Sequence, residues 1–202
     1  MIFLDYTVAR IKNSAKKTFY EKGFNGARIQ EIANSADVSK SLLYYYFNTK
    51  DHLFKIIIHD SINEVVKHMS PILINQLSFI ELIDQFISNV LILFKDNKKL
   101  LSFVINEYNQ NFDKIRYELK PIVNFIKEFE YKIRIQSLKE NINIKDTRNL
   151  IVDIISLCGW QVIGINIFNL EKSDDKDSGL IDITEARKNI YESIVSLYNK
   201  NE

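Results

Sequence analysis

Apolar residues recur every three or four positions along most of this chain, which is the spacing of an amphipathic α-helix. In residues 5–22, for example, one face carries Val8, Ile11, Ala15 and Phe19. Similar patterns cover residues 29–35, 40–47, 49–69, 78–95, 98–110, 113–140, 146–170 and 183–200. No stretch shows the alternating period of a half-buried strand. The pattern predicts an all-α protein with about nine helices in total.

Few residues interrupt these helices. The 202 residues include only five Gly and two Pro, which favours long helices over a turn-rich β fold. Gly23 is expected to end the first helix as a C-terminal cap. Thr49 is expected to cap the start of the next long helix, and Pro71 to mark the end of that helix.

Two short helical patterns lie close together in residues 29–50, IQEIANSADVSKSLLYYYFNTK. The first places Ile29, Ile32 and Ala33 on one face, and the second places Leu43 and Phe47 four positions apart. Each pattern is long enough for about two turns of helix. Both short helices therefore have one apolar face that can be buried.

The four residues between these patterns, Ala36-Asp37-Val38-Ser39, have the chemistry of a tight turn. Asp37 adopts a left-handed conformation at lower cost than most residues. Val38 supplies an apolar side chain for the turn to bury, and Ser39 is a good N-cap for the second helix. Two helices joined in this way form a helix-turn-helix unit, whose second helix enters the major groove of DNA.

The outer face of the second helix has an unusual composition. If Leu43 points inward, then Ser41, Tyr44 and Tyr45 point outward, and Lys40 stands at the helix start. Phenol rings contact thymine methyl groups and sugars, while their hydroxyls bind phosphate. The alternative is a tyrosine-rich core helix with one partly exposed edge. The flanking turn and the neighbouring lysines favour DNA recognition.

The charge is distributed unevenly along the chain. The whole chain has a formal net charge of +1. Residues 1–50 contain eight Lys or Arg against four Asp or Glu, whereas the remainder contains 19 basic and 22 acidic residues. Binding to a polyanion is therefore expected of the N-terminal segment, where the helix-turn-helix pattern also lies.

Residues 8–53 resemble the DNA-binding domain of the TetR family of bacterial transcriptional regulators. The matching positions are Ile11, Ala15, Phe19, Gly23-Phe24, Ile29, Ile32-Ala33, Val38-Ser39-Lys40, Leu43-Tyr44-Tyr45-Tyr46-Phe47, Lys50 and Leu53. Two positions depart from the family pattern. Ala27 stands where a capping Thr is usual, so the second helix must be capped in another way, and Asp37 stands where Gly is usual.

The resemblance implies a particular organisation and function. Residues 1–50 would form the helix-turn-helix DNA-binding domain, and residues 51–202 a helical effector-binding and dimerisation domain. The protein would be a homodimeric transcriptional regulator, most simply a repressor, that a small-molecule effector releases from double-stranded operator DNA. We expect the DNA contacts to come from Arg28, Gln30, Ser39, Lys40, Ser41, Tyr44, Tyr45 and Lys50.

The most apolar stretch is residues 146–170, for which a membrane span is the alternative interpretation. Asp153, Gln161 and Asn166 interrupt it, and its uninterrupted apolar run is well short of the roughly 20 residues needed. A buried helix is therefore expected. In the family, the last two long helices pair with those of a second copy. The expected dimer interface contains Gly159, Gly164, Ile190, Ile194 and Leu197, unless both helices only close the monomer core.

Aromatic residues of the C-terminal region are candidates for an effector pocket. They are Phe103, Tyr108, Phe112, Tyr117 and Trp160, with Glu107 as a partner for a cationic effector. For each one taken singly, core packing or a place on the surface is the alternative.

No catalytic or cofactor motif is present. The sequence lacks phosphate-binding glycine loops, a nucleophile elbow and a Cys/His cluster. His52, His59 and His68 do not share one helix face closely, so no metal site is expected. Neither an enzyme nor a cofactor is predicted. The alternative is a helical enzyme or small-molecule-binding protein with an incidental basic head.

The single cysteine, Cys158, indicates a reducing compartment, because it excludes an internal disulfide. The first residues, MIFLDYTVAR, contain no apolar run long enough for a signal peptide. The expected location is the cytoplasm, with no membrane association.

Overall fold

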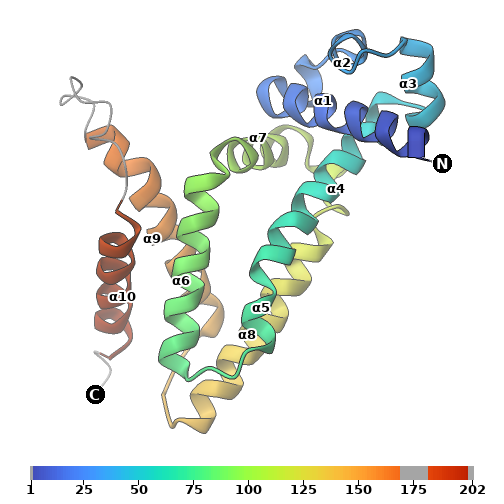
Figure 1. Ribbon diagram of the computed structural model, residues 1–202. Helices are drawn as coiled ribbons and strands as arrows, with labels where there is room; N and C mark the ends of the chain where they lie inside the picture. The colour runs from blue at the N-terminus through green and yellow to red at the C-terminus, as the bar shows by residue number, and fades with distance from the viewer. Residues whose placement is uncertain (1, 169–181, 200–202) are drawn as a thin grey trace. The chain divides into compact units, whose positions relative to one another are not determined.

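The computed structural model of the protein describes residues 2–168 and 182–199, and within these ranges the regular structure is entirely helical (Figure 1). The predicted all-α fold is confirmed. Ten helices are described, of which α5 is a single turn. They are α1 Ile2–Gly26, α2 Ile29–Ser35, α3 Lys40–Phe47, α4 Lys50–Met69, α5 Pro71–Ile74, α6 Phe79–Asp96, α7 Lys98–Ile115, α8 Lys120–Lys139, α9 Thr147–Phe168 and α10 Ile183–Asn199.

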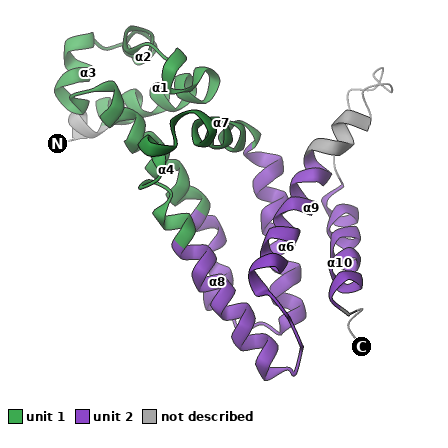
Figure 2. Cartoon of the chain, turned by 180° about the vertical axis from the view of Figure 1, so that it is seen from behind, with its two compact units in different colours: residues 1–65, 98–123 green, residues 66–97, 124–202 purple. Residues whose placement is uncertain are grey.

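The chain forms two compact units (Figure 2). Unit 1 contains residues 1–65 and 98–123, and unit 2 contains residues 66–97 and 124–202. The predicted division at residue 50 does not coincide with these units. α7 packs against α1, and the first part of α4 belongs to the same unit, so unit 1 extends beyond the helix-turn-helix.

An aromatic cluster explains why α4 and α7 belong to unit 1. The ring of Phe54, on α4, lies 5.1 Å from Phe19, 4.8 Å from Phe24 and 5.9 Å from Phe103 between centroids, each with edge-to-face geometry. Phe19 and Phe54 are fully buried, and Phe103, on α7, is 2% exposed. Such pairs stabilise a fold by roughly 0.5–1.5 kcal/mol each beyond the area that they bury.

Several helix ends confirm or correct the sequence predictions. Thr49 Oγ1 accepts a hydrogen bond of 3.0 Å from His52 N, which confirms it as a cap of α4. Residues 113–140 do not form one helix as predicted. Instead, α7 ends at Ile115 and α8 begins at Lys120. Pro121 lies in the first turn of α8, where its missing N–H removes no helical bond.

The regular part of α1 stops at Gly23, where the sequence predicts the end of the first helix. Gly23 has φ 65° and ψ 179°, which produces a kink, and one further turn follows before the helix ends at Gly26. This conformation lies in a region that residues with a Cβ rarely adopt. The kink therefore sets where the next helix, α2, begins.

Unit 2 is built around α6, which packs against both α9 and α10. Phe86 of α6 lies 4.3 Å from Phe129 of α8 between ring centroids. A Cβ on Gly159 of α9 would lie 3.3 Å from the Phe94 ring, so this glycine permits close packing within unit 2. The neighbouring Cys158 is fully buried, and burial raises the pKa of its thiol to about 12. None of the described helices has the length and apolar character to cross a membrane.

Candidate DNA-binding interface

The helix-turn-helix forms as the sequence predicts. α2 buries Ile29, Ile32 and Ala33, and α3 buries Leu43 and Phe47. These five side chains turn the apolar faces of both short helices toward the core of unit 1. The opposite faces of α2 and α3 remain at the surface.

The turn between α2 and α3 adopts the expected backbone conformation. Asp37 has φ 49°, so the residue that replaces the usual glycine does take the left-handed conformation. Its N–H donates to Asn34 O at 3.1 Å, and Val38 N donates to Ala33 O at 3.0 Å. Val38 itself is half-buried. Ser39 Oγ then accepts from Leu42 N at 3.1 Å, which confirms Ser39 as the N-cap of α3.

The outer face of α3 is exposed and carries the predicted polar and aromatic side chains. Lys40, Ser41, Tyr44 and Tyr45 are all exposed, and the exposed fraction of Tyr45 reaches 75%. Lys40 Nζ lies 5.9 Å from the centroid of the Tyr44 ring. A core position is thereby excluded for Tyr45. The face offers one cation, hydroxyl groups and flat rings to a ligand that lies along α3.

α2 contacts α3, and the start of α2 has an exposed polar surface of its own. Arg28 is the N-cap residue of α2 and is exposed, but no side chain caps the helix there. Instead, Glu31 lies in the first turn and pairs with Lys22 at 2.8 Å, and this hydrogen bond lowers the pKa of Glu31. The negative charge of Glu31 interacts favourably with the positive end of the helix dipole. This interaction takes the place of the missing Thr cap. Gln30 is exposed and donates to Asn34 Oδ1 at 2.9 Å.

Arg10 stabilises the turn from α1, a role that sequence analysis missed. Its Nε donates to Ala36 O at 2.9 Å, and its Nη2 donates to Asp37 O at 2.6 Å. Nη2 also lies 3.3 Å from Asp37 Oδ2. Nothing in the helical pattern distinguishes Arg10 from the other cations of residues 1–50, because its partners are 26 and 27 positions away.

Lys50 differs from the other predicted DNA contacts because it is half-buried. Its Nζ lies 4.6 Å from the centroid of the Phe24 ring, and Lys114 Nζ lies at the same distance from that ring. Burial lowers the pKa of Lys50, although the charge of Glu107 acts in the opposite direction. Lys50 is therefore held in an aromatic and charged cluster at the start of α4.

The six residues predicted to form an effector pocket differ in their surroundings. Phe103 belongs to the aromatic core of unit 1, and Glu107 is 2% exposed. Tyr108 and Phe112 form an exposed pair on α7 with ring centroids 5.1 Å apart. Tyr117 and Trp160 are also exposed. Within α7, the helical period turns Phe103 and Tyr108 to different faces, and the effector pocket stays a prediction.

The predicted dimer-interface residues are also in different environments. Ile190 and Ile194 are 2% and 4% exposed, so they belong to the core of unit 2 rather than to a surface that a second copy could contact. The close approach at Gly159 is to Phe94 of the same chain. Leu197 is 58% exposed and stays a candidate. The surroundings of Gly164 lie outside the described residues.

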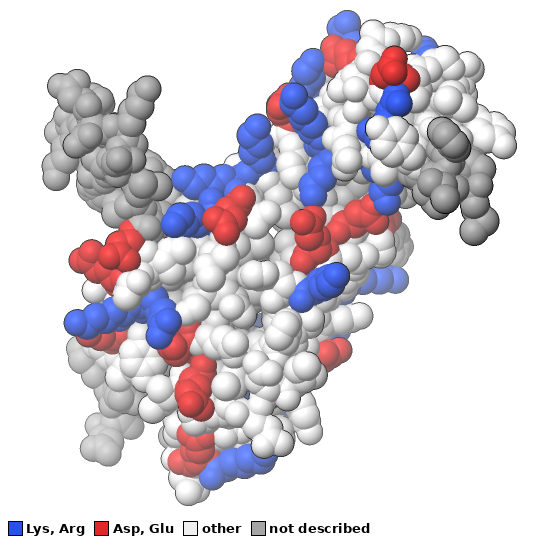
Figure 3. Space-filling view, in the orientation of Figure 1, with Lys and Arg blue, Asp and Glu red and all other residues white. Residues whose placement is uncertain are grey.

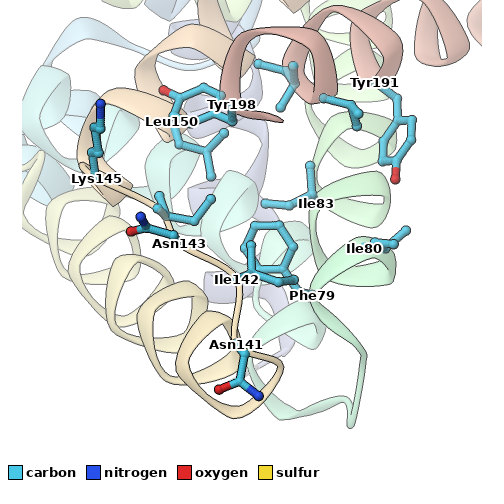
Figure 4. Close-up of a pocket in the computed structure, with 13 residues that line it drawn as sticks. Phe79, Ile80, Ile83, Asn141, Ile142, Asn143, Lys145, Leu150, Tyr191 and Tyr198 are labelled. Atoms are coloured by element: carbon cyan, nitrogen blue, oxygen red, sulfur yellow. The ribbon is translucent and has the colours of Figure 1, made fainter. Parts of the chain in front are cut away.

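A cavity of about 730 Å³ opens in unit 2 (Figure 4). It is formed by the start of α6, residues 141–145 between α8 and α9, and one face of α10. Apolar side chains such as Phe79, Ile83 and Ile142 line most of it, while Asn143 and Tyr198 add polar groups (Figure 4). Its size is typical of small-molecule sites.

The surface charges do not point to a metal site. Figure 3 shows basic and acidic side chains interspersed on one face of the molecule. Within the described ranges, no group of three His, Cys, Asp or Glu side chains could hold a metal ion. The exposed face and the buried support of α2 and α3 are those of a helix-turn-helix DNA-binding protein.

Comparisons with known proteins agree with this class. A family model described as "Bacterial regulatory proteins, tetR family" matches residues 11–57. The HTH-type transcriptional repressor NicS of Pseudomonas putida is 40% identical over 50 residues, which are 25% of this chain and 24% of NicS. The HTH-type transcriptional regulator RutR of Escherichia coli K12 is 46% identical over 44 residues, which are 22% of this chain and 21% of RutR. The chain therefore matches about a quarter of the length of these curated relatives.

Solved structures extend the likeness of fold to nearly the whole chain. FadR from Bacillus subtilis, in complex with stearoyl-CoA, aligns with a TM-score of 0.68 and 18% identity over 94% of this chain and 98% of that chain. A TetR-like transcriptional regulator from Rhodococcus sp. RHA1 also has a TM-score of 0.68, with 17% identity over 96% of this chain and 97% of that chain. Residues 11–57 therefore match the DNA-binding domain of the TetR family of bacterial transcriptional regulators, and the likeness of the rest of the chain is one of fold.

Proposed function

We propose that the protein is a homodimeric transcriptional repressor that leaves its operator when a small-molecule effector binds. The exposed face of α3 carries this proposal, because Lys40, Ser41, Tyr44 and Tyr45 project from a helix whose other face is fixed in the core. Because a repressor acts on chromosomal DNA, we place the protein in the cytoplasm.

In the proposed complex, α3 lies in the major groove. Tyr44 and Tyr45 contact base edges, thymine methyl groups and sugars, and Gln30 reads a base from the neighbouring helix. Arg28 and Lys50 bind phosphates, as do the hydroxyls of the exposed Ser39 and Ser41. These phosphate contacts position the head, whereas the contacts of α3 select the sequence. Arg10 acts indirectly, because it holds the turn that orients α3.

Exposed apolar residues on α9 and α10 support a homodimer. Val152 and Trp160 of α9 are 53% and 58% exposed, and Leu197 of α10 is 58% exposed. Val152, Ser156 and Trp160 recur every four positions and are all exposed, so they share one face of α9. Large exposed apolar side chains on one helix face are typical of protein interfaces. We propose that this face pairs with its copy and that two heads then bind half-sites about 34–36 Å apart or a multiple of that distance.

Unit 2 supplies candidate effector-binding features. The cavity of Figure 4 has mostly apolar walls with polar groups among them, which suits an organic molecule with an apolar body. FadR of Bacillus subtilis, which shares the fold, was solved with stearoyl-CoA. An effector of acyl type is therefore the first class to test. It would release the operator only if it binds the DNA-incompetent state more tightly than the competent one.

Selection of DNA by the purified protein tests the proposal. Genomic fragments retained by the protein are sequenced, and the enriched sequence is made as a labelled duplex for fluorescence anisotropy. The proposal predicts one enriched sequence with two-fold symmetry. Retention of all fragments without enrichment would contradict it. A fall in operator affinity on addition of acyl-CoA, with no effect of free CoA, would support the effector class.

A further inference from the structure

Glu107 of α7 is a buried carboxylate that the proposed DNA contacts do not use. It is 2% exposed, and it is the only charged residue in the buried class within the described parts of the chain. Both of its oxygens are engaged: Oε1 accepts from Phe24 N at 2.7 Å, and Oε2 accepts from Asn111 Nδ2 at 2.7 Å. Burying a charge is unfavourable unless it is well hydrogen-bonded, so this arrangement requires a local explanation.

The contacts of Glu107 lie at the bend in α1, and this position explains why the carboxylate is buried. Phe24 directly follows the kink at Gly23, and a Cβ on Gly23 would lie only 2.8 Å from Glu107 Oε1. After the kink, Ala27 N donates to Gly23 O at 3.2 Å, and α2 begins two residues later. Glu107 therefore accepts from the first backbone N–H after the bend that connects α1 to the helix-turn-helix.

The same cluster extends to the start of α4. Lys50 and Lys114 both lie over the Phe24 ring, and Lys114 pairs with Asp51 at 3.2 Å. The start of α4 follows α3 after only two residues. α7 thus contacts the chain immediately before α2 and immediately after α3, although residues 107 and 24 are 83 positions apart.

We propose that Glu107 is a positioning residue for operator recognition, because it fixes the Gly23–Phe24 bend and thereby the orientation in which α2 and α3 meet DNA. This inference rests on the proposed function. Without an acceptor for Phe24 N–H, the head would sample other bend angles, and only the fraction with the correct angle would bind the operator. Non-specific binding depends on phosphate contacts rather than on this orientation, so it would be retained.

Four proteins test the proposal: wild type, Glu107→Ala, Glu107→Gln and Asp113→Ala. Asp113 is a carboxylate of the same helix whose side chain is 92% exposed, so its variant controls for the loss of a charge from α7. Affinities for the selected operator and for a scrambled duplex are measured by anisotropy at a temperature at which circular dichroism shows each variant folded. Melting temperatures are recorded in parallel.

We expect Glu107→Ala to lose operator affinity by about tenfold or more, with scrambled-duplex affinity and salt slope unchanged. Glu107→Gln retains an acceptor oxygen for Phe24 N and should stay within about threefold of wild type. Asp113→Ala should match wild type. If Glu107→Ala does not fold, Glu107→Asp is used, because it keeps the charge but withdraws the acceptor by one methylene group, and it should show the same selective loss.

Several results would overturn the inference. One is a folded Glu107→Ala protein with a lower melting temperature but full operator affinity, because Glu107 would then be only structural. Another is a Glu107→Gln protein as weak as the alanine variant, because the acceptor would then not be the cause. Full affinity in Glu107→Asp, where that variant is needed, would have the same meaning. A wild type without sequence-specific binding would instead refute the proposed function.

Discussion

Replacing Gly23 by Ala tests the packing of the bend in unit 1. With φ 65° and ψ 179°, Gly23 lies in a region that is essentially restricted to glycine, so a side chain costs about 1–3 kcal/mol there. The added Cβ would also lie 2.8 Å from Glu107 Oε1, which is closer than real Cβ contacts allow. From the backbone strain and the steric clash together, we expect the free energy of unfolding to fall by about 2–4 kcal/mol. That is a large part of the free energy of unfolding of a typical domain.

Gly26 provides the matched control for this substitution. It lies in the same helix without a positive φ, and its nearest contact for a new Cβ is Lys22 Cβ at 3.3 Å. Gly26→Ala should therefore change stability by less than about 1 kcal/mol. Urea unfolding followed by circular dichroism measures both variants. In a Glu107→Ala background, Gly23→Ala should cost less, because the steric part is removed while the backbone part remains.

The reasoning would be refuted if Gly23→Ala were as stable as Gly26→Ala. That result would mean that the bend relaxes without cost. An equal cost of Gly23→Ala in the presence and absence of Glu107 would show instead that the contact with the carboxylate contributes nothing.

Three further predictions concern the DNA face and the dimer. Tyr44→Phe should weaken operator binding by about 1 kcal/mol through loss of a hydroxyl contact, and Tyr44→Ala should weaken it by more. If anisotropy shows unchanged operator affinity in the folded alanine variant, Tyr44 is not part of the interface. Lys50→Ala should weaken specific and scrambled DNA alike and reduce the salt slope by about one, whereas an unchanged slope would exclude a phosphate contact. Trp160→Glu should give a folded protein that sediments as a monomer, and a dimeric Trp160→Glu protein would place the interface elsewhere. Ile194→Glu should instead unfold unit 2, because it buries an unpaired charge.

Local sequence was sufficient to predict the helix-turn-helix. Its signals act within a few residues: the helical period of α2 and α3, the left-handed Asp37 and the capping Ser39. Each short-range preference agrees with the final fold, so each could be recognised from the sequence. The exposed face of α3 followed from the same periodicity.

The features that sequence did not reveal depend on contacts between distant residues. Arg10 binds carbonyls 26 and 27 positions away, and Glu107 binds an N–H 83 positions away. Aromatic residues of α7 were assigned to a pocket, but Phe103 packs in the core of unit 1 while Tyr108 faces solvent. An apolar stripe such as that of Ile190 and Ile194 is compatible with a dimer interface or with a monomer core, and burial alone decides between them.

The central claim is that the exposed face of α3 recognises a DNA sequence, and a competition measurement tests it most directly. The labelled operator obtained by selection is displaced with unlabelled operator or with a scrambled duplex of equal length and composition, at fixed salt. The account predicts that the operator competes at least about a thousandfold better than the scrambled duplex. Equal competition by the two duplexes, with the same salt dependence, would contradict it.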